Sequence, residues 1–127
     1  MDRLTLADLL LIAEAVLVTD VERLAKVIDV PSAESALAAP FAGFGELDFY
    51  PGPAMKAAIL CSRLLRNHPL PDGNKRTAYL AMLELLGRNG HAWIQPEDDE
   101  AAEMIERVAA RAVTEEEFAA WVAEHVG

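Results

Sequence analysis

The side chains best suited to chemistry lie in one short segment, which reads His-Pro-Leu-Pro-Asp-Gly-Asn-Lys-Arg-Thr from His68 to Thr77. The imidazole of His68 can accept a proton near neutral pH. The carboxylate of Asp72 is a hard ligand of the kind that holds Mg²⁺ against phosphate groups. Lys75 and Arg76 add two positive charges. Together these groups indicate a site that holds phosphates and moves a proton beside them.

A helix is expected to begin at Gly73–Asn74, because an apolar helical pattern follows and glycine permits the unusual backbone angles of a tight entry. The start of a helix leaves several backbone N–H groups unpaired, which makes it a natural anion site. Lys75 and Arg76 fall in the first turn, where the helix dipole disfavours cations. Two cations at this end are best explained by an anion that completes the site.

The distribution of charge also favours an anionic ligand. The chain of 127 residues has a formal net charge of −10. Residues 54–90 nevertheless hold six Lys or Arg and two acids, so this segment is +4 and the remainder is −14. A concentration of positive charge in one segment of an acidic chain attracts anionic ligands. The strongly acidic chain as a whole argues against binding to nucleic acid or to anionic membranes.

Each of these features has a structural explanation when taken alone. A histidine before proline is usually a loop residue, Asp-Gly is usually a turn, and Lys-Arg is usually solvated. Their occurrence within nine residues, between two apolar helices, favours the functional interpretation. The chain lacks the Gly-x-x-x-x-Gly-Lys-Ser/Thr pattern of a P-loop NTPase and lacks a Cys–His metal spacing.

Hydrophobic periodicity predicts one mostly helical domain over residues 1–127. Two helices that are apolar on most faces, over 53–67 and from Asn74 to about Asn89, are expected to form its core. Pro69 and Pro71 are expected to hold His68 and Leu70 in extended backbone between them. The other helices are expected over 7–18, 21–28 and 32–38, after Pro96 and after Thr114.

An aromatic segment at 41–51 interrupts the helical pattern and predicts a loop or short hairpin. Composition alone favours packing of this segment into the core over a role as a binding flap. Cys61, the one cysteine, lies in an apolar helix and is expected to pack there. Without a possible intrachain disulfide or an N-terminal signal pattern, the chain is expected to be cytoplasmic.

The segment from His68 to Ala78 resembles the signature of the Fic/Doc superfamily and is closer to its Doc branch, the death-on-curing toxins. The resemblance extends over nearly the whole chain. It implies a compact all-α fold with a small β-hairpin flap, and a site that binds ATP and Mg²⁺. By this resemblance, His68 is the base that deprotonates a target hydroxyl and Asp72 holds the metal.

The resemblance also assigns the residues that hold the nucleotide. The backbone at Gly73 and Asn74, with the side chains of Lys75 and Arg76, holds the phosphates, and Arg66 assists. The flap aligns a target peptide by strand addition. The partners implied are a small Phd-like antitoxin, whose disordered tail folds onto the toxin, and a translation factor such as elongation factor Tu.

Two departures from the AMP-transferring Fic pattern bear on the reaction. Lys75 replaces the second glycine of that pattern and Tyr79 replaces its final arginine. In the Doc branch such a lysine accompanies a reversed nucleotide, so the resemblance favours a protein kinase that phosphorylates a Thr or Ser hydroxyl and blocks translation. The alternatives are an AMP transferase and a catalytically degenerate homologue that acts as a binding partner. Leu70, which replaces the family aromatic, is the one feature of the motif that favours a degenerate homologue.

Overall fold

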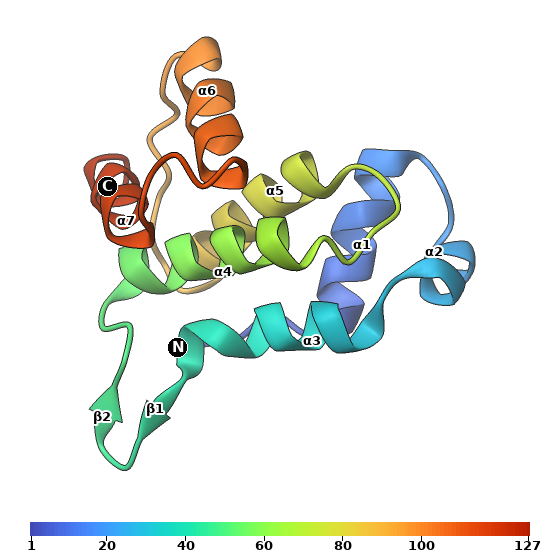
Figure 1. The fold of residues 1–127 in the computed structure, drawn as a ribbon, viewed down its shortest axis with the longest axis horizontal. Coiled ribbons are helices and arrows are strands. Elements are labelled where there is room, and N and C mark those ends of the chain that lie inside the picture. Colours follow the sequence, from blue (N-terminus) through green and yellow to red (C-terminus); the bar gives the residue numbers. More distant parts are fainter.

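Helices make up most of the fold, and two short strands form its one sheet (Figure 1). The computed structural model describes residues 1–127. Its elements are α1 (Leu6–Leu17), α2 (Val21–Val27), α3 (Val30–Ala38), the 3₁₀ turn η1 (Ala39–Phe41), β1 (Gly43–Phe44), β2 (Leu47–Asp48), α4 (Pro53–Asn67), α5 (Asn74–Arg88), α6 (Asp98–Ala109) and α7 (Glu115–Glu124). The prediction of an all-α fold with a small hairpin is confirmed.

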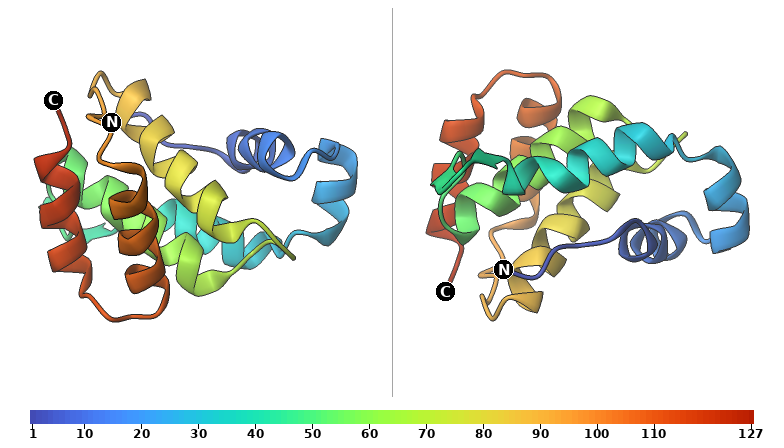
Figure 2. Two further views of the ribbon diagram at one scale, coloured as in Figure 1. Left: turned by 90° about the horizontal axis from the view of Figure 1, so that it is seen from above. Right: turned by 90° about the horizontal axis from the view of Figure 1, so that it is seen from below.

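Helices α4 and α5 form the centre of the molecule, as their apolar patterns predict. They pack on each other, with α3 and α7 against α4, α1 against α5, and α6 against both. Figure 2 shows α6 and α7 on one side of this pair, away from α1 and α2. Cys61 and Leu86 are among the fully buried side chains of the core, so the expected packing of Cys61 is confirmed. No helix is both long enough and apolar enough to span a bilayer.

Several helices begin where a side chain caps the first turn. Thr5 and Asp8 form a capping box at the start of α1. The carboxylate of Asp29 accepts the N–H of Ser32, at 3.2 Å. This cap starts α3 at Val30, two residues before the predicted bound, and leaves Pro31 in the first turn where proline is tolerated.

The cap of α1 makes a prediction for acid stability. The hydrogen bond from Arg88 holds the pKa of Asp8 at about 2, below its ordinary value of about 3.9. A lowered pKa stabilises the fold above pH 4, and this contribution is lost as pH falls toward 2. Asp8→Ala is expected to cost roughly 1 kcal/mol at pH 6. Urea unfolding at pH 6, 4 and 3 should show the difference from wild type shrinking as the solution becomes more acidic.

A nearby carboxylate provides the control for this prediction. Asp2 is exposed, and its side chain has no hydrogen-bond partner. Asp2→Asn should therefore leave the free energy of unfolding within about 0.5 kcal/mol of wild type at each pH. An Asp8→Ala deficit that stays constant from pH 6 to pH 3 would contradict the assignment.

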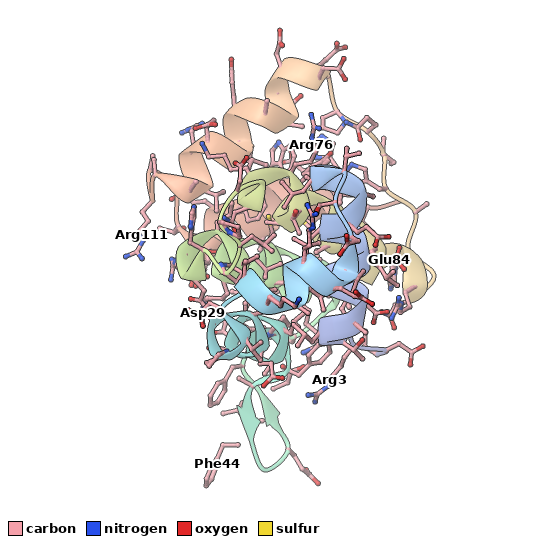
Figure 3. The ribbon with its side chains drawn as sticks, turned by 90° about the vertical axis from the view of Figure 1, so that its right-hand side faces the viewer. Arg3, Asp29, Phe44, Arg76, Glu84 and Arg111 are labelled. Carbon is pink, nitrogen blue, oxygen red and sulfur yellow. The ribbon has the colours of Figure 1, made fainter.

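The hairpin projects away from the helices instead of packing into the core. Its strands pair Gly43 with Asp48 and Phe44 with Leu47, and Phe44 extends from its tip (Figure 3). The side chain of Phe44 is 81% exposed. The prediction that the aromatic segment packs into the core is therefore wrong for the tip. Only its base, with Phe41, packs against the helical body, because two-residue strands are too short to fold back over it.

Candidate functional site

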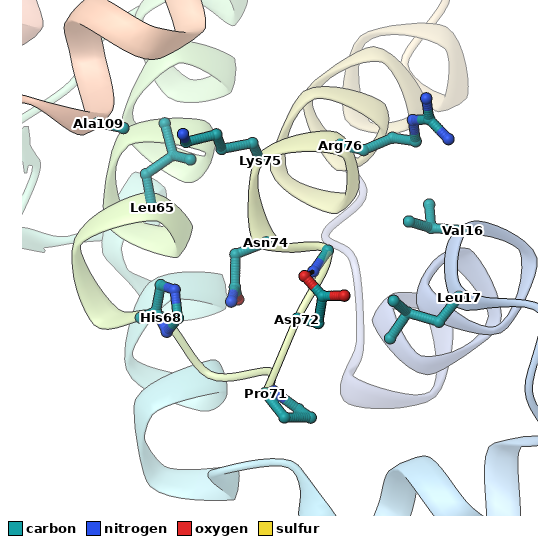
Figure 4. Close-up of a pocket in the computed structure, with 11 residues that line it drawn as sticks. Val16, Leu17, Leu65, His68, Pro71, Asp72, Asn74, Lys75, Arg76 and Ala109 are labelled. Atoms are coloured by element: carbon teal, nitrogen blue, oxygen red, sulfur yellow. Dashed lines mark hydrogen bonds between the residues drawn. The ribbon is translucent and has the colours of Figure 1, made fainter.

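The connector between α4 and α5 forms the floor of a cleft of about 530 Å³ (Figure 4). Six of the seven predicted site residues line this cleft: His68, Asp72, Gly73, Asn74, Lys75 and Arg76. Its walls come from Leu65 of α4, Val16 and Leu17 of α1, and Ala109 of α6. The motif gives no signal for Val16, Leu17 and Ala109, because these residues are brought to the cleft by the packing of α1 and α6. The seventh predicted residue, Arg66, does not line the cleft.

His68 ends α4 in a left-handed conformation, with φ 48° and ψ 55°. The expectation of an extended backbone at this residue is wrong. Left-handed residues commonly terminate helices, and the N–H of His68 still bonds the carbonyl of Leu64 at 3.1 Å. Histidine enters this region more readily than most side chains. The turn leaves the ring exposed at the cleft, with no hydrogen-bond partner in the chain.

Asn74 fixes the connector from within. Its side chain is buried and makes two hydrogen bonds to the backbone of Leu70. The amide oxygen accepts the Leu70 N–H at 3.1 Å, and the amide nitrogen donates to the Leu70 carbonyl at 2.8 Å. Leu70 is itself buried, so it supplies the apolar anchor expected in place of the family aromatic. The side chain of Asn74 is therefore committed to the loop, and only its backbone N–H is available to a ligand.

Helix α3 secures the outer side of the connector. The N–H of Asp29 donates to the carbonyl of Pro69 at 2.8 Å. The side-chain amide of Asn67 donates to the carbonyl of Ser32 at 2.9 Å. These bonds and those of Asn74 restrain the backbone on both sides of His68. The loop is therefore held in one shape before any ligand binds, which is the condition for a preorganised site.

Gly73 is required at the entry to α5 for two physical reasons. Its φ of +72° lies in the left-handed region, as expected from the Asp-Gly-Asn sequence. A Cβ at this position would also lie 2.8 Å from Cδ2 of Leu17. The end of α1 therefore packs directly behind the start of α5. A larger residue would displace the side chain of Leu17 and would also be strained by the left-handed backbone at this position.

The start of α5 presents unpaired N–H groups to the cleft. The backbone N–H groups of Asn74, Lys75 and Arg76 have no acceptor in the chain, and no side chain caps the helix. Asp72 instead bonds the N–H of Gly73 through Oδ1, at 2.8 Å, which leaves Oδ2 free. Three free N–H groups at the positive end of a helix dipole form a strong site for an anion.

Comparisons of the sequence with known proteins place the segment that forms this connector in a known family. The Fic/DOC family matches residues 3–86, which include every predicted site residue. The chain belongs to the Fic/Doc family. A protein of Mycolicibacterium smegmatis named Toxin Doc is 41% identical over 87 residues, which cover 68% of this chain and 67% of that protein. No solved structure matches the chain. The similarity places the chain in the Doc branch of the family and supports its being a toxin of a toxin–antitoxin module.

Acidic residues beyond the part that matches the Fic/Doc family neutralise much of the positive charge near the site. Lys75 pairs with Glu106 of α6, with Nζ and Oε1 2.7 Å apart. Arg63 and Arg66 pair with Glu115 of α7, at 2.9 and 3.7 Å. Burial alone would raise the pKa of Glu115, but hydrogen bonding and charge from Arg63 lower it below its usual range.

Because of these ion pairs, most of the positive charge of residues 54–90 is already paired with carboxylates, whereas the sequence predicted that it would be available to an anionic ligand. Arg76 is the one cation of residues 54–90 that has no carboxylate within 4 Å. Figure 4 shows its side chain and that of Lys75 leaving α5 in opposite directions. Arg66 points to Glu115, so it reaches a ligand in the cleft only if this ion pair opens. The geometry thus distinguishes Arg76, whose charge is unpaired, from Lys75 and Arg66.

The hairpin of this Fic/Doc protein does not border the cleft. It leads into Pro53 at the start of α4, whereas His68 follows the end of that helix. A helix of 15 residues is about 22 Å long, and no hairpin residue lines the cleft. The expected alignment of a target peptide beside His68 therefore requires the peptide to extend along α4, or the hairpin to move.

Proposed function

We propose that this protein is a toxin that acts as an ATP-dependent protein kinase on a Thr or Ser hydroxyl of a translation factor such as elongation factor Tu. One observation carries the proposal: a histidine ring without a partner shares a preorganised cleft with a helix start whose N–H groups have no acceptor. The histidine ring is suited to accept a proton, and the free N–H groups are suited to hold a phosphate. A kinase needs both, close together.

The residues of the cleft fit ATP with Mg²⁺. Free N–H groups at the start of α5 suit phosphate oxygens, and Arg76 offers an unpaired charge beside them. Asp72 retains one free carboxylate oxygen, and no group of three or more metal-binding side chains is present. A single carboxylate suits Mg²⁺ that also binds phosphates and water. When bound, ATP with Mg²⁺ supplies the phosphoryl group.

In the proposed reaction, His68 takes the proton from the target hydroxyl as its oxygen forms a bond to the γ-phosphorus. The bond from that phosphorus to the bridging oxygen breaks, and ADP leaves with the electron pair. The N–H groups of Asn74, Lys75 and Arg76 hold the oxygens on which negative charge lies. Because the connector is fixed on both sides, these donors need little rearrangement during the step.

The side chains at positions 75 and 79 support phosphoryl transfer over AMP transfer. Lys75 extends toward α6 and bonds Glu106, so it occupies space that a glycine would leave open. The hydroxyl of Tyr79 accepts the N–H of Trp93 at 3.0 Å. Position 79 therefore carries an engaged phenol in place of the arginine that AMP-transferring Fic proteins place there.

We also propose that a Phd-like antitoxin restrains this toxin. An exposed groove of about 520 Å³ lies between α1 and α5, with Leu11, Leu80 and Leu83 along it. The side chain of Leu11 is 58% exposed. An amphipathic segment of the antitoxin would bury these leucines by folding onto the groove.

Intact-protein mass spectrometry tests the proposed reaction. The purified protein is incubated with Mg²⁺, ATP and elongation factor Tu, and His68→Ala serves as the control. We expect a mass gain of one phosphate on elongation factor Tu with wild type and no gain with the variant. A gain of one AMP would reject the kinase in favour of adenylyl transfer. If no gain occurs, the assay is repeated in a whole-cell lysate. A lysate in which no protein is modified would reject the proposal that this protein is an enzyme.

Glu106 should weaken phosphate binding, because it competes for Lys75 at the edge of the cleft. Exposed ion pairs of this kind contribute up to about 1 kcal/mol. Glu106→Gln is therefore expected to lower the Kd for ATP with Mg²⁺ roughly two- to fivefold. Isothermal titration calorimetry measures this change.

Glu116→Gln provides the matched control, because it removes the same charge from an exposed residue of α7 that has no ion pair. Its Kd should remain within about twofold of wild type. Equal gains in the two variants would mean that net charge alone, and not the pair with Lys75, determines the effect. Weaker binding by Glu106→Gln would mean that Glu106 assists the ligand.

A further inference from the structure

The hairpin is too short to hold its own direction. Each of its strands, β1 and β2, has two residues, and all four residues are exposed. An isolated two-stranded hairpin is at best marginally stable in water. The connection to α4 adds little, because Gly52 has a φ of +88° and only its chain neighbours lie within 4 Å of the place where a Cβ would stand. Side chains that reach the hairpin from the helical body must therefore hold it.

Lys56, in the first turn of α4, contacts both sides of the hairpin at its base. Its Nζ donates to the two carboxylate oxygens of Asp48 in β2, at 2.8 and 2.7 Å. It also donates to the carbonyl of Pro40, which precedes β1, at 3.1 Å. An ammonium group has three N–H donors, and these three contacts use all of them. The side chain of Lys56 is only 12% exposed, so water competes little for its charge.

Other cations contact one side of the hairpin each. Cζ of Arg3 lies 4.3 Å from the centre of the Phe41 ring, which precedes β1. Nη2 of Arg63 donates to the hydroxyl of Tyr50, which follows β2, at 2.9 Å. Nζ of Lys56 is also 5.4 Å from the centre of the Phe41 ring, within the range of a cation–π contact. Lys56 is therefore the residue that joins the two sides of the base.

The hairpin held in this way presents a surface suited to a protein. Phe44, Leu47 and Phe49 are all exposed on it, and clustered exposed apolar side chains indicate an interaction site. Its two strands pair only with each other, so each has a free edge that can pair with another extended chain. The proposed function requires a protein substrate, which is the occupant that we assign to this surface.

We propose that Lys56 is a positioning residue that holds the hairpin as a fixed template for an extended segment of the protein substrate. The inference rests on the proposed function and goes beyond it, because it decides how a target on the hairpin reaches His68. A hairpin fixed by Lys56 does not swing toward the cleft. The substrate must instead extend along α4, over roughly 22 Å, which takes about seven residues of extended chain.

Kinetics of Lys56→Met distinguish a fixed hairpin from a swinging one. Methionine retains much of the apolar stem and removes all three donors. If Lys56 positions the hairpin, the KM for elongation factor Tu should rise about fivefold or more, whereas kcat and the Kd for ATP with Mg²⁺ should stay within about twofold. If the hairpin has to swing, its release should lower the KM, and that result would overturn the proposal. Lys26→Met, at an exposed lysine of α2 without an ion pair, is the matched control and should change neither constant.

Hydrogen exchange measured by NMR tests the role of Lys56 without a substrate. The N–H of Phe49 bonds the carbonyl of Ala42 at 3.1 Å, so its exchange reports whether the hairpin is closed. We expect about fivefold faster exchange in Lys56→Met and a smaller increase in Asp48→Asn, which retains shape but loses the charge. The double variant should exchange no faster than Lys56→Met, because both substitutions break the same pair. Lys26→Met should exchange like wild type.

The two measurements together decide the proposal. Unchanged exchange in both Lys56→Met and Asp48→Asn would overturn it, because the hairpin would then hold its shape without the pair. Faster exchange with an unchanged KM would also overturn it, because the substrate would not depend on the hairpin. If wild type phosphorylates no protein, the proposed function fails and the substrate role of the hairpin fails with it. The exchange rates would still decide whether Lys56 holds the hairpin.

Discussion

His68→Ala is expected to slow phosphoryl transfer by about 10²- to 10⁴-fold, the usual contribution of a general base. The ring of His68 has no hydrogen-bond partner in the chain and is exposed at the cleft. Its removal should therefore leave the fold and the phosphate site intact, so the Kd for ATP should stay within about twofold. Single-turnover kinetics with labelled ATP measure the rate, and calorimetry measures the Kd.

Two further variants make this result specific. His68→Asn retains a polar side chain that tolerates the left-handed backbone at this position, but it cannot act as a base, so it should be as slow as the alanine variant. His91→Ala removes a histidine outside the cleft and should retain the wild-type rate. A His68 variant with wild-type rate would show that no base acts from this position. A His68→Ala variant that still inhibited bacterial growth fully would instead revive the interpretation of the protein as a catalytically degenerate binding partner.

Asn74→Asp is expected to have the largest effect on stability among the site residues. The substitution preserves shape but replaces the donor that bonds the Leu70 carbonyl by an oxygen. At pH 7 it places a charge at a buried position beside a carbonyl oxygen, which should lower the free energy of unfolding by about 2–3 kcal/mol. Urea unfolding at pH 7 measures this loss. Binding of phosphate should weaken as well, because the new charge lies at the anion site.

The dependence on pH identifies the cause of the loss. Burial raises the pKa of the introduced carboxyl, and protonation restores a donor toward the Leu70 carbonyl. A raised pKa stabilises the fold at low pH and ceases to do so as pH rises through it. The deficit relative to wild type should therefore be smaller at pH 4.5 than at pH 7. An equal deficit at both values would show that the two bonds to Leu70 do not hold the loop.

Local sequence was sufficient to predict the elements whose ends are determined by nearby residues. Capping boxes that start with Thr5 and Thr114 begin α1 and α7 close to the predicted starts of these helices. The same is true of Gly73, whose left-handed backbone follows from the residue itself. His68 was mispredicted because the preference imposed by Pro69 competes with the need to end α4, and the helix end prevails. That outcome depends on how α3 and α5 hold the loop.

The environment of the charges was not predictable from the motif. Lys75 finds its partner 31 residues away, and Arg63 finds its partner 52 residues away. The exposure of Phe44 has the same origin, since burial of an aromatic depends on which surface lies opposite it. Patterns within a segment indicate which groups are present. The packing of α6 and α7 decides which of them remain unpaired.

The ion pairs to α6 and α7 involve different residues from the hydrogen bonds that shape the connector. The connector between α4 and α5 takes its shape from hydrogen bonds to α3 and to Asn74. Lys75 and Arg66 pair instead with Glu106 and Glu115, which lie beyond the residues that match the family. On the proposed function, we expect substitutions of these two carboxylates to change the affinity for ATP while the connector keeps its shape. The proposed function thus assigns the strength of nucleotide binding in part to the C-terminal third of the chain and the reaction itself to the connector.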